Sequence, residues 1–388
     1  MRKVCVIGVG QTRFGRLPYT TRDLALMAAR EAVEDAGIDV REIQGCFVSN
    51  AFSWTERQGH LGPLIMSGLG IATAPATVVE SACASGSSAI REAYVNIMAG
   101  MYDVMLVVGV ERVQHLDTIR ATTYFTYGGD YLFEGGVGAS FPGLYAAIAR
   151  AHMAKYGTTE EQMALVAVKN HDNGLLNPKA HIHKKITVED VLKSPVVAHP
   201  LKLYDCCPFS DGAAAAVLCS EEYARRMGAE RRIYIRGSGR AGGPLALHDR
   251  EDLTSLIGTR LAAEEAFRRA GLDRKSIDFA EVHDAFTIAE IVALEDLGFY
   301  EKGEAARAVE NGETRLGGRF PVNPSGGLKS KGHPVGATGV GQLVEIFDQL
   351  TERAGPRQVH GARVALAHNV GATGGSVVVT IYSRDPPA

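Results

Sequence analysis

The sequence predicts an α/β protein, because short apolar segments alternate along the chain with amphipathic helical segments. The segment "DVMLVVGVE" (residues 103–111) is almost continuously apolar, as is typical of a strand covered on both faces. A pattern of helix, Ala-Gly and strand also occurs twice, once in each half of the chain. These observations together predict layers of helices and sheets built from two similar halves.

The strands are predicted from short apolar runs that end at glycine or at polar residues. We expect them at residues 3–9, 45–50, 103–110, 213–219, 232–237, 278–283, 362–368 and 375–382. Two long helices are predicted from apolar residues that repeat with helical spacing. The first carries Ile90, Ala93, Tyr94, Ile97 and Met98, and the second carries Val340, Leu343, Val344, Phe347 and Leu350.

The repeat is visible in "AREAVEDAGIDVREIQGCFVSNAF" and "AEEAFRRAGLDRKSIDFAEVHDAF". Gly37 aligns with Gly271 and Phe52 with Phe286, and both pairs are 234 residues apart. Helices in α/β proteins often end at a glycine before a strand, so two such segments can be similar by chance. A shared register over more than twenty residues favours duplication instead. We therefore expect halves at about 1–225 and 230–388, with an insertion at about 112–205 that lines a binding site.

Composition excludes several classes of protein. The 388 residues include 41 Lys plus Arg and 44 Asp plus Glu, so a basic field for nucleic acid is absent. No apolar run approaches the roughly 18 residues of a membrane helix, and the first residues are read as a buried strand rather than a secretion signal. Six cysteines without regular spacing do not make a disulfide framework, so a cytoplasmic location is expected.

One cysteine, Cys83, stands in "VVESACASGSSAI" (residues 78–90), directly ahead of the first long helix. A free cysteine is often only a small buried apolar residue. At a helix N-terminus, however, unpaired N–H groups and a partial positive charge favour a thiolate. The small neighbours would leave room for a bulky electrophile; they are Ala82, Ala84, Ser85 and Gly86.

Two further motifs contain histidines. In "EVHDAFTIAE", His283 follows a predicted strand and precedes a helix, where it points into a cleft or merely accompanies an N-cap formed by Asp284 or Thr287. In "NPSGGLKSKGHPVGATGVG" (residues 323–341), Pro334 holds His333 extended, and the glycines allow a ligand to approach the backbone. This loop lacks the spacing of a phosphate-binding P-loop.

A weaker signal is "NVGATGGS" (residues 369–376) between two predicted strands. Its backbone N–H groups would suit an oxyanion site, and the alternative is a glycine-rich hairpin turn. The only other cluster of chemical interest is His181, His183, Cys206 and Cys207. Its spacings match no standard zinc pattern, so no metal site is expected.

Together, "ESACASGSSA", "HDAF" and "NPSGGLKSKGHPVGATG" resemble the thiolase family over nearly the whole chain. Ordinary biosynthetic and degradative thiolases have Asn-Glu-Ala-Phe where this chain has "HDAF". A histidine there resembles the non-decarboxylating sterol-carrier-protein-type thiolases and their archaeal and bacterial relatives. The resemblance implies a five-layered αβαβα sandwich of two similar halves, with a loop domain inserted in the first.

The resemblance also implies roles for individual residues. Cys83 would take the acyl group from coenzyme A, His333 would activate the thiol, and His283 would help to hold a thioester oxygen. The backbone N–H of Cys83 and the last glycine loop would form the other oxyanion hole, with Gly371, Gly374 and Asn369 as its residues. Substrate or coenzyme A would contact Ser325, Gly326, Gly327, Lys329 and Lys331, although loop lysines are commonly only solvated.

The chain departs from the family at one position. Thiolases normally use a second cysteine as the acid and base at the α-carbon, either in the last glycine loop or directly after the His-Asp pair. This chain has Asn369 and Ala285 at those places. Either another group, such as His283 or His333, handles the α-proton, or the reaction is altered, or the chain is an inactive relative, or Ala285 is a deliberate replacement of a cysteine.

The leading hypothesis is a thiolase-type acyltransferase that acts on a 3-oxoacyl-CoA, with a bulky or aryl substrate as the finer expectation. A decarboxylating condensing enzyme with a Cys-His-His site and a non-catalytic acyl-CoA-binding subunit stay open. Coenzyme A is expected as co-substrate, with no permanently bound cofactor. The family analogy suggests a homodimer and a complex with a small accessory protein that carries a zinc ribbon and an OB-fold.

Overall fold

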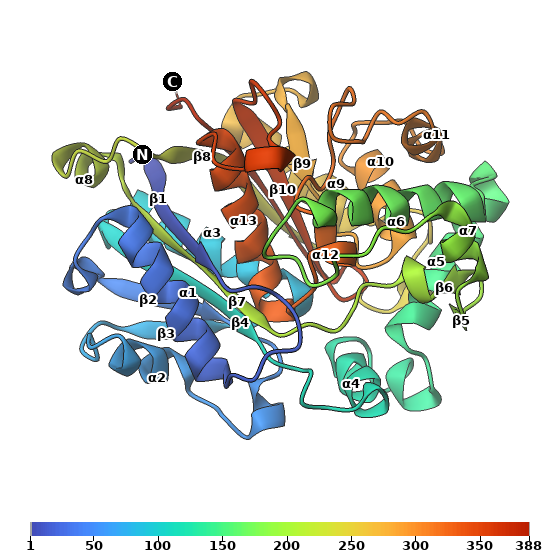
Figure 1. Ribbon diagram of the computed structural model, residues 1–388, viewed down its shortest axis with the longest axis horizontal. Helices are drawn as coiled ribbons and strands as arrows, with labels where there is room; N and C mark the ends of the chain where they lie inside the picture. The colour runs from blue at the N-terminus through green and yellow to red at the C-terminus, as the bar shows by residue number, and fades with distance from the viewer. Residues whose placement is uncertain (1, 388) are drawn as a thin grey trace.

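The computed structural model describes residues 2–387 as a mixed α/β fold with a nine-stranded sheet (Figure 1). The strand order is β3-β2-β4-β7-β1-β8-β11-β10-β9. The strands are β1 (Val4–Gln11), β2 (Gly45–Ser49), β3 (Ala76–Val79), β4 (Val104–Glu111), β7 (Gly212–Ser220), β8 (Ile233–Gly242), β9 (Phe279–Glu281), β10 (Val364–Gly371) and β11 (Ser376–Ser383). A separate two-stranded sheet pairs β5 (Val196–Ala198) with β6 (Leu201–Lys202).

Helices separate and cover the strands. They are α1 (Thr21–Ala36), α2 (Leu61–Gly68), α3 (Ser85–Met98), α4 (Thr118–Phe125), α5 (Phe141–Tyr156), α6 (Glu160–Leu175), α7 (Val188–Lys193), α8 (Glu221–Arg226), α9 (Ile257–Ala270), α10 (Thr287–Asp296), α11 (Ala305–Glu310), α12 (Gly327–Ser330) and α13 (Thr338–Leu350). Within residues 2–387, no helix has the length and apolar character needed to cross a membrane.

The two ends of the sheet repeat the same plan. On one side β2 is parallel to β4, and β7 and β1 then follow in antiparallel order. On the other side β9 is parallel to β10, and β11 and β8 follow in antiparallel order. The two sides meet where β1 pairs with β8 at Cys5–Tyr234 and Val6–Ile233.

Close packing of glycines against helix backbones repeats in the same way. A Cβ added to Gly8 or Gly10 would lie within 2.6 Å of backbone atoms of α1. A Cβ added to Gly237 or Gly239 would lie equally close to the backbone of α9. The absence of a side chain at these four positions lets each helix lie directly on its strand. The structural repeat therefore agrees with the repeat seen in the sequence.

Three apolar clusters define the layers of the molecule. One lies between the β1 side of the sheet and helices α1 and α2. A central cluster joins α3 and α13 to strands from both sides. The third packs α9 and α10 against the β8–β11 side and extends to α5 and α6. Helices thus occupy the middle and both outer layers, as the predicted five-layered sandwich requires, and α13 is visible between the blue and red strands in Figure 1.

Some predicted elements differ from the structure. Strand β3 was not predicted, because "ATVV" is short and partly exposed at the edge of the sheet. Strand β8 was predicted to end at residue 237, whereas it continues over small residues to Gly242. No helix was predicted within residues 112–205, and the structure forms α4, α5, α6 and α7 there.

Candidate active site

Cys83 lies at the central layer of the molecule, between β3 and α3. It occupies a single 3₁₀ turn, Ala82–Ala84, and α3 begins two residues later at Ser85. Ala82 has a φ of 48°, a left-handed conformation that costs a non-glycine residue about 1–3 kcal/mol. The strained turn presents a half-buried Cys83 at the start of the helix.

Two backbone N–H groups, that of Ala372 and its own, face the Cys83 sulfur and act to lower its pKa. These donors favour a thiolate, but removal from water outweighs them and raises the pKa of Cys83 to about 12. In the resting protein the sulfur is therefore a neutral thiol. The two N–H groups remain in place to stabilise negative charge that develops during a reaction.

The first turns of α3 and α13 touch, and this contact brings Cys83 and His333 together. A Cβ on Gly86 would lie 2.8 Å from the backbone nitrogen of Gly339. A Cβ on Gly339 would lie 2.3 Å from the backbone nitrogen of Ser87. Only glycine allows the two helices to approach this closely. Gly339 of the predicted histidine loop therefore serves helix packing.

His333 is buried, and one ring nitrogen is fixed by Thr338. The Thr338 hydroxyl donates to the Pro334 carbonyl at 3.0 Å, so its oxygen accepts from Nδ1 of His333 at 2.6 Å. This arrangement leaves Nε2 of His333 without a proton. Burial lowers the pKa of His333 to about 3. The ring is therefore a neutral base whose free lone pair is on Nε2.

The His283 ring has the opposite tautomer to the His333 ring, because the side-chain amide of Asn369 binds its Nδ1. The Asn369 side-chain amide donates to Nδ1 of His283 at 3.2 Å and to the Cys83 carbonyl at 2.9 Å. Its oxygen accepts from the backbone N–H of Ser87, which fixes the orientation of the amide. Nδ1 of His283 therefore carries a lone pair and Nε2 carries the proton. Burial lowers the pKa of His283 as well, so the ring is a neutral N–H donor.

The three groups are close enough to act on one substrate. The Cys83 sulfur and one nitrogen from each of His283 and His333 lie within 4.8 Å of one another. The two rings are 5.1 Å apart and nearly perpendicular, at 84°. The same spacing would accommodate a metal ion, but a metal ligand needs a free lone pair, and Nε2 of His283 carries a proton. The site combines a thiol, a base and a hydrogen-bond donor.

A cavity of about 360 Å³ opens in front of these three groups. Its walls are largely apolar and aromatic, and its size falls within the range of small-molecule pockets. Much of the wall comes from the 112–205 segment and the residues just after it, which contribute Thr118, Thr122, Phe125, Phe141, Pro142, Tyr145, Val197, Leu203, Cys206 and Cys207. The segment expected to line a binding site thus lines this cavity. Among the described residues, the lining includes no lysine or arginine.

Glu111 supports the site and was not predicted from the sequence. At the end of β4, it accepts hydrogen bonds from the backbone N–H groups of Ala51, Phe52 and Gly336 and from the Asn50 amide. Complete burial raises the pKa of Glu111 to about 7. The carboxyl group thus ties the histidine loop at Gly336 to β4. A glutamate at the end of an apolar strand was the only available signal.

The structure does not place the predicted coenzyme A contacts in the cavity. Ser325, Gly326 and Gly327 are buried, and Ser325 donates to the Glu281 carboxyl group. Lys329 and Lys331 are interior residues whose ammonium groups donate to the carbonyls of Cys206 and Gly341. The expectation that these two lysines are exposed and meet the phosphates of coenzyme A is wrong. Both support neighbouring loops instead.

The capping alternative for the His283 motif is also wrong. Helix α10 begins after Phe286 without a side-chain cap. Asp284 accepts from the backbone N–H groups of Leu328 and Lys329 at the start of α12, and Thr287 donates to Asp205. Asp284 therefore fixes the loop that precedes His333.

The last glycine loop faces Cys83 through a different residue from those expected. Ala372, rather than Gly371 or Gly374, supplies the N–H that faces Cys83. Gly374 lines a separate hollow beside Arg250, and the Gly371 N–H belongs to the β10–β11 hairpin. Asn369 was expected among the backbone donors, whereas it acts through its side chain on His283.

The His181, His183, Cys206 and Cys207 cluster does not assemble in the structure. His181 is bonded to Ser210 and His183 to the Asn177 carbonyl, whereas the two cysteines line the cavity. Within residues 2–387, the only set of three or more suitably spaced candidate ligands is Cys83, His283 and His333.

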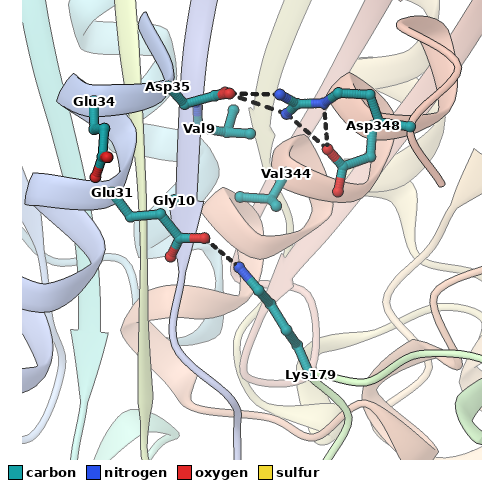
Figure 2. A pocket seen from close by; sticks show the side chains of 9 residues that line it. Val9, Gly10, Glu31, Glu34, Asp35, Lys179, Val344 and Asp348 are labelled. Carbon is teal, nitrogen blue, oxygen red and sulfur yellow. Dashed lines mark hydrogen bonds and ion pairs between the residues drawn. The ribbon is translucent and has the colours of Figure 1, made fainter.

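A second hollow of about 390 Å³ lies between α1 and α13 and shares no lining residue with the first (Figure 2). Its walls carry ion pairs: Lys179 contacts Glu31 at 2.6 Å, and Arg353 bridges Asp35 and Asp348. These ion pairs connect the insertion to α1 through Lys179, and α1 to α13 through Arg353.

Comparison with known proteins agrees with this geometry. Residues 4–222 match the family model described as thiolase, N-terminal domain, and residues 239–384 match thiolase C-terminal domain-like. A solved structure titled Ltp2-ChsH2(DUF35) aldolase aligns with a TM-score of 0.83 at 24% identity, covering 97% of each chain.

Three curated relatives extend this result. The chain is 46% identical to an acetyl-CoA acetyltransferase of Methanothermobacter thermautotrophicus, over 99% of this chain and 100% of the relative. It is 36% identical to sterol carrier protein 2 of Gallus gallus, over 100% of this chain and 72% of the relative. It is 35% identical to the benzoylsuccinyl-CoA thiolase subunit BbsB of Thauera aromatica, over 95% of both. The predicted sterol-carrier and archaeal branch is confirmed, and the chain belongs to the thiolase family as an acyltransferase.

Proposed function

We propose that the protein transfers acyl groups between coenzyme A and a 3-oxoacyl-CoA through an acyl-Cys83 intermediate. The observation that carries the proposal is the complementary state of the two histidines around the thiol. Nε2 of His333 is free to accept the Cys83 proton, and Nε2 of His283 is protonated and able to donate. A nucleophile, a base and an oxyanion donor are what covalent acyl transfer requires.

In the cleavage direction, His333 removes the thiol proton as Cys83 attacks the C3 carbonyl of the substrate. The backbone N–H groups of Cys83 and Ala372 stabilise the oxygen that becomes negative. The C2–C3 bond then breaks, which leaves the acyl group on Cys83 and releases acetyl-CoA once its α-carbon is protonated. Coenzyme A finally takes the acyl group from Cys83. The His283 N–H polarises the thioester carbonyl of the departing acetyl-CoA.

Isotope exchange tests this function. Incubation with acetyl-CoA and labelled coenzyme A is expected to exchange label into acetyl-CoA without a second acyl substrate, because the acyl enzyme forms reversibly. Cys83→Ser should abolish the exchange, whereas Cys46→Ser, at a cysteine buried away from the cavity, should retain it. Absence of exchange in the wild-type protein would contradict the proposal.

We further propose that the acyl group is bulky, with an aryl 3-oxoacyl-CoA as the leading candidate. Support comes from the aromatic wall, where Tyr145 stacks on Phe286 at 4.5 Å and Phe125 packs against Phe209 at 5.0 Å. Thiolysis rates over a panel of aryl, branched and linear 3-oxoacyl-CoAs test this. A preference for aryl substrates is expected, and activity confined to acetoacetyl-CoA would contradict it.

A decarboxylating condensing enzyme with the same three groups makes a different prediction. Such an enzyme would release CO2 from a malonyl thioester. We expect no CO2 release above the Cys83→Ser background, together with thiolysis of 3-oxoacyl-CoA. CO2 release without thiolysis would favour the alternative.

We propose that the protein works as a homodimer with a small accessory subunit that carries a zinc ribbon and an OB-fold. The cavity lining has no lysine or arginine for the phosphates of coenzyme A. Several large apolar side chains between residues 119 and 137 are exposed, namely Ile119, Leu132, Phe133 and Val137. Analytical ultracentrifugation is expected to show a dimer. The six unpaired cysteines suit a reducing compartment, and we place the protein in the cytoplasm.

A further inference from the structure

A second thiol lines the catalytic cavity, and the acyl-transfer steps described so far do not use it. The backbone N–H of Cys207 donates to the Ala285 carbonyl at 2.9 Å, so Cys207 lies beside the His283 motif. Its side chain is part of the wall that also contains Cys83, His283 and His333. An acyl group on Cys83 would extend into the space that Cys207 borders.

The neighbouring Cys206 differs from Cys207 in the hydrogen bonding of its thiol. The Cys206 thiol donates to the Lys202 carbonyl, with sulfur and oxygen 3.5 Å apart. The Cys207 thiol makes no hydrogen bond to any of the described residues. One of two adjacent thiols is thus engaged by the protein, and the other remains available to a ligand.

The reaction needs one more proton-transfer group than the site described above supplies. Cleavage of the C2–C3 bond leaves a carbanion at C2 that takes up a proton, and condensation removes that proton again. His333 already holds the Cys83 proton, Nδ1 of His283 is held by Asn369, and the Tyr145 hydroxyl donates to the Ala372 carbonyl. Among the titratable groups that line the cavity, Cys207 alone has no partner and no role.

We propose that Cys207 is the acid and base that protonates and deprotonates the α-carbon of the second acyl-CoA. This inference rests on the proposed acyl transfer through Cys83. It offers a different answer to the question raised by Ala285 and Asn369, because the missing thiol is supplied from a different segment of the chain. Cys207 would touch the substrate directly and is therefore a catalytic residue.

Protons and electrons balance over the cycle. As the C2–C3 bond of the Cys83-bound adduct breaks, its electron pair goes to C2, which takes the proton from the Cys207 thiol. Acetyl-CoA leaves, and the Cys207 thiolate accepts the thiol proton of the incoming coenzyme A. The resulting coenzyme A thiolate attacks acyl-Cys83, and the departing Cys83 thiolate recovers its proton from His333. Condensation is the reverse of these steps.

The surroundings of Cys207 suit this cycle. Burial raises the pKa of Cys207, so the resting group is a protonated acid, and the thiolate formed in the cycle is a strong base. Lys329 is the nearby cation that favours the thiolate, whereas Cys206, Cys83 and Asp284 oppose it. The buried ammonium group would stabilise the transient charge.

The test separates the α-carbon step from acylation. Cys207→Ala, Cys207→Ser and the control Cys46→Ala are compared with wild type in thiolysis and in two further measurements. Acylation of Cys83 by acetyl-CoA needs no α-proton, and intact mass measures its rate. Deuterium uptake into the methyl group of acetyl-CoA in D2O needs the α-carbon base, and mass spectrometry of the product measures it.

Both Cys207 variants are expected to lose deuterium uptake and thiolysis by roughly 100-fold or more while Cys83 acylation stays within about threefold of wild type. Cys46→Ala, at a buried cysteine outside the cavity, should retain all three activities. Uptake retained in Cys207→Ala, rescue by Cys207→Ser, or an equal loss of acylation and uptake would each overturn the proposal. Absence of acylation in wild type would instead overturn the proposed function on which it rests.

Discussion

The first turns of α3 and α13 occupy equivalent places in the two halves of the molecule, yet they carry different chemistry. Each helix lies in the central layer, and the two touch through Gly86 and Gly339. The first presents Cys83 in a strained turn with backbone N–H groups around the sulfur. The second is preceded by His333, whose ring is fixed by Thr338 at the start of the helix. One loop stabilises an anion and the other accepts a proton.

This difference shows how a duplicated fold gains a two-component site. Duplication supplies two helix N-termini that meet at the middle of the molecule, and each half then specialises. Neither component is charged at rest, because burial raises the pKa of Cys83 to about 12 and lowers that of His333 to about 3. The thiolate therefore forms only when substrate draws the sulfur into reaction.

The largest expected effect comes from removing the base of the second loop. His333→Ala should lower kcat/KM for thiolysis by roughly a thousandfold, since a positioned base contributes about 10²- to 10⁴-fold. Stopped-flow or steady-state assays at pH 8 measure the loss. His181→Ala, at a histidine bonded to Ser210 outside the cavity, is the control and should stay close to wild type. Comparable activity in both variants would refute the assigned base.

Substitution of Asn369 tests whether its side-chain amide orients the His283 ring for the reaction. Asn369→Asp replaces the donor to Nδ1 of His283 with an acceptor, so the ring proton should move away from Nε2. Groups that orient a functional histidine are typically worth about 10- to 100-fold. Thiolysis should fall by that factor, and ¹⁵N NMR of the His283 ring should report the altered tautomer. A loss of activity with an unchanged tautomer would argue against this role.

Thr338 orients the His333 ring as Asn369 orients the His283 ring, and we expect its substitution to have a smaller effect. Thr338→Val removes the oxygen that accepts from Nδ1 of His333 while it preserves the shape of the side chain. We expect a loss of about tenfold in kcat, at the lower end of such orienting effects. Thr338→Ser retains the hydroxyl and should retain the activity, so equal losses in the two variants would point to packing instead.

The smallest expected effect concerns the charge state of Cys83. Because the pKa of Cys83 is raised, its alkylation by iodoacetamide should be slow at pH 7 and should rise with pH beyond 9. His333→Ala should move the midpoint of this profile by less than about half a unit, because a neutral imidazole does not stabilise the thiolate. A resting ion pair would instead show a wild-type midpoint below 8, raised by about one to three units in the variant.

Much of this arrangement could be predicted from the sequence. The register between Gly37 and Gly271 and between Phe52 and Phe286 is enough to indicate two similar halves. Helical spacing located α3 and α13, and the small residues around Cys83 suggested a nucleophile. These signals are local, because strand and helix patterns depend on residues close together in the chain.

The remaining features depend on contacts between distant segments. Asn369 bonds His283, 86 residues away, and Glu111 bonds Gly336, 225 residues away. Lys329 and Lys331 look like solvated loop residues in the sequence, yet other segments of the fold bury both. Cys207 gave no sign of its place in the cavity, because the contact with Ala285 joins the residues just after the insertion to the second half. Sequence spacing carries no information about such pairings.

The most direct test of the proposed chemistry is to trap the acyl enzyme. The protein is incubated with a 3-oxoacyl-CoA without free coenzyme A, quenched in acid, digested and mapped by mass spectrometry. We expect one acyl group per chain, on Cys83, absent from Cys83→Ser and unchanged in Cys46→Ala, at a cysteine outside the cavity. An adduct on another residue, or none in a protein that still cleaves the substrate, would contradict the central claim that Cys83 carries the acyl group.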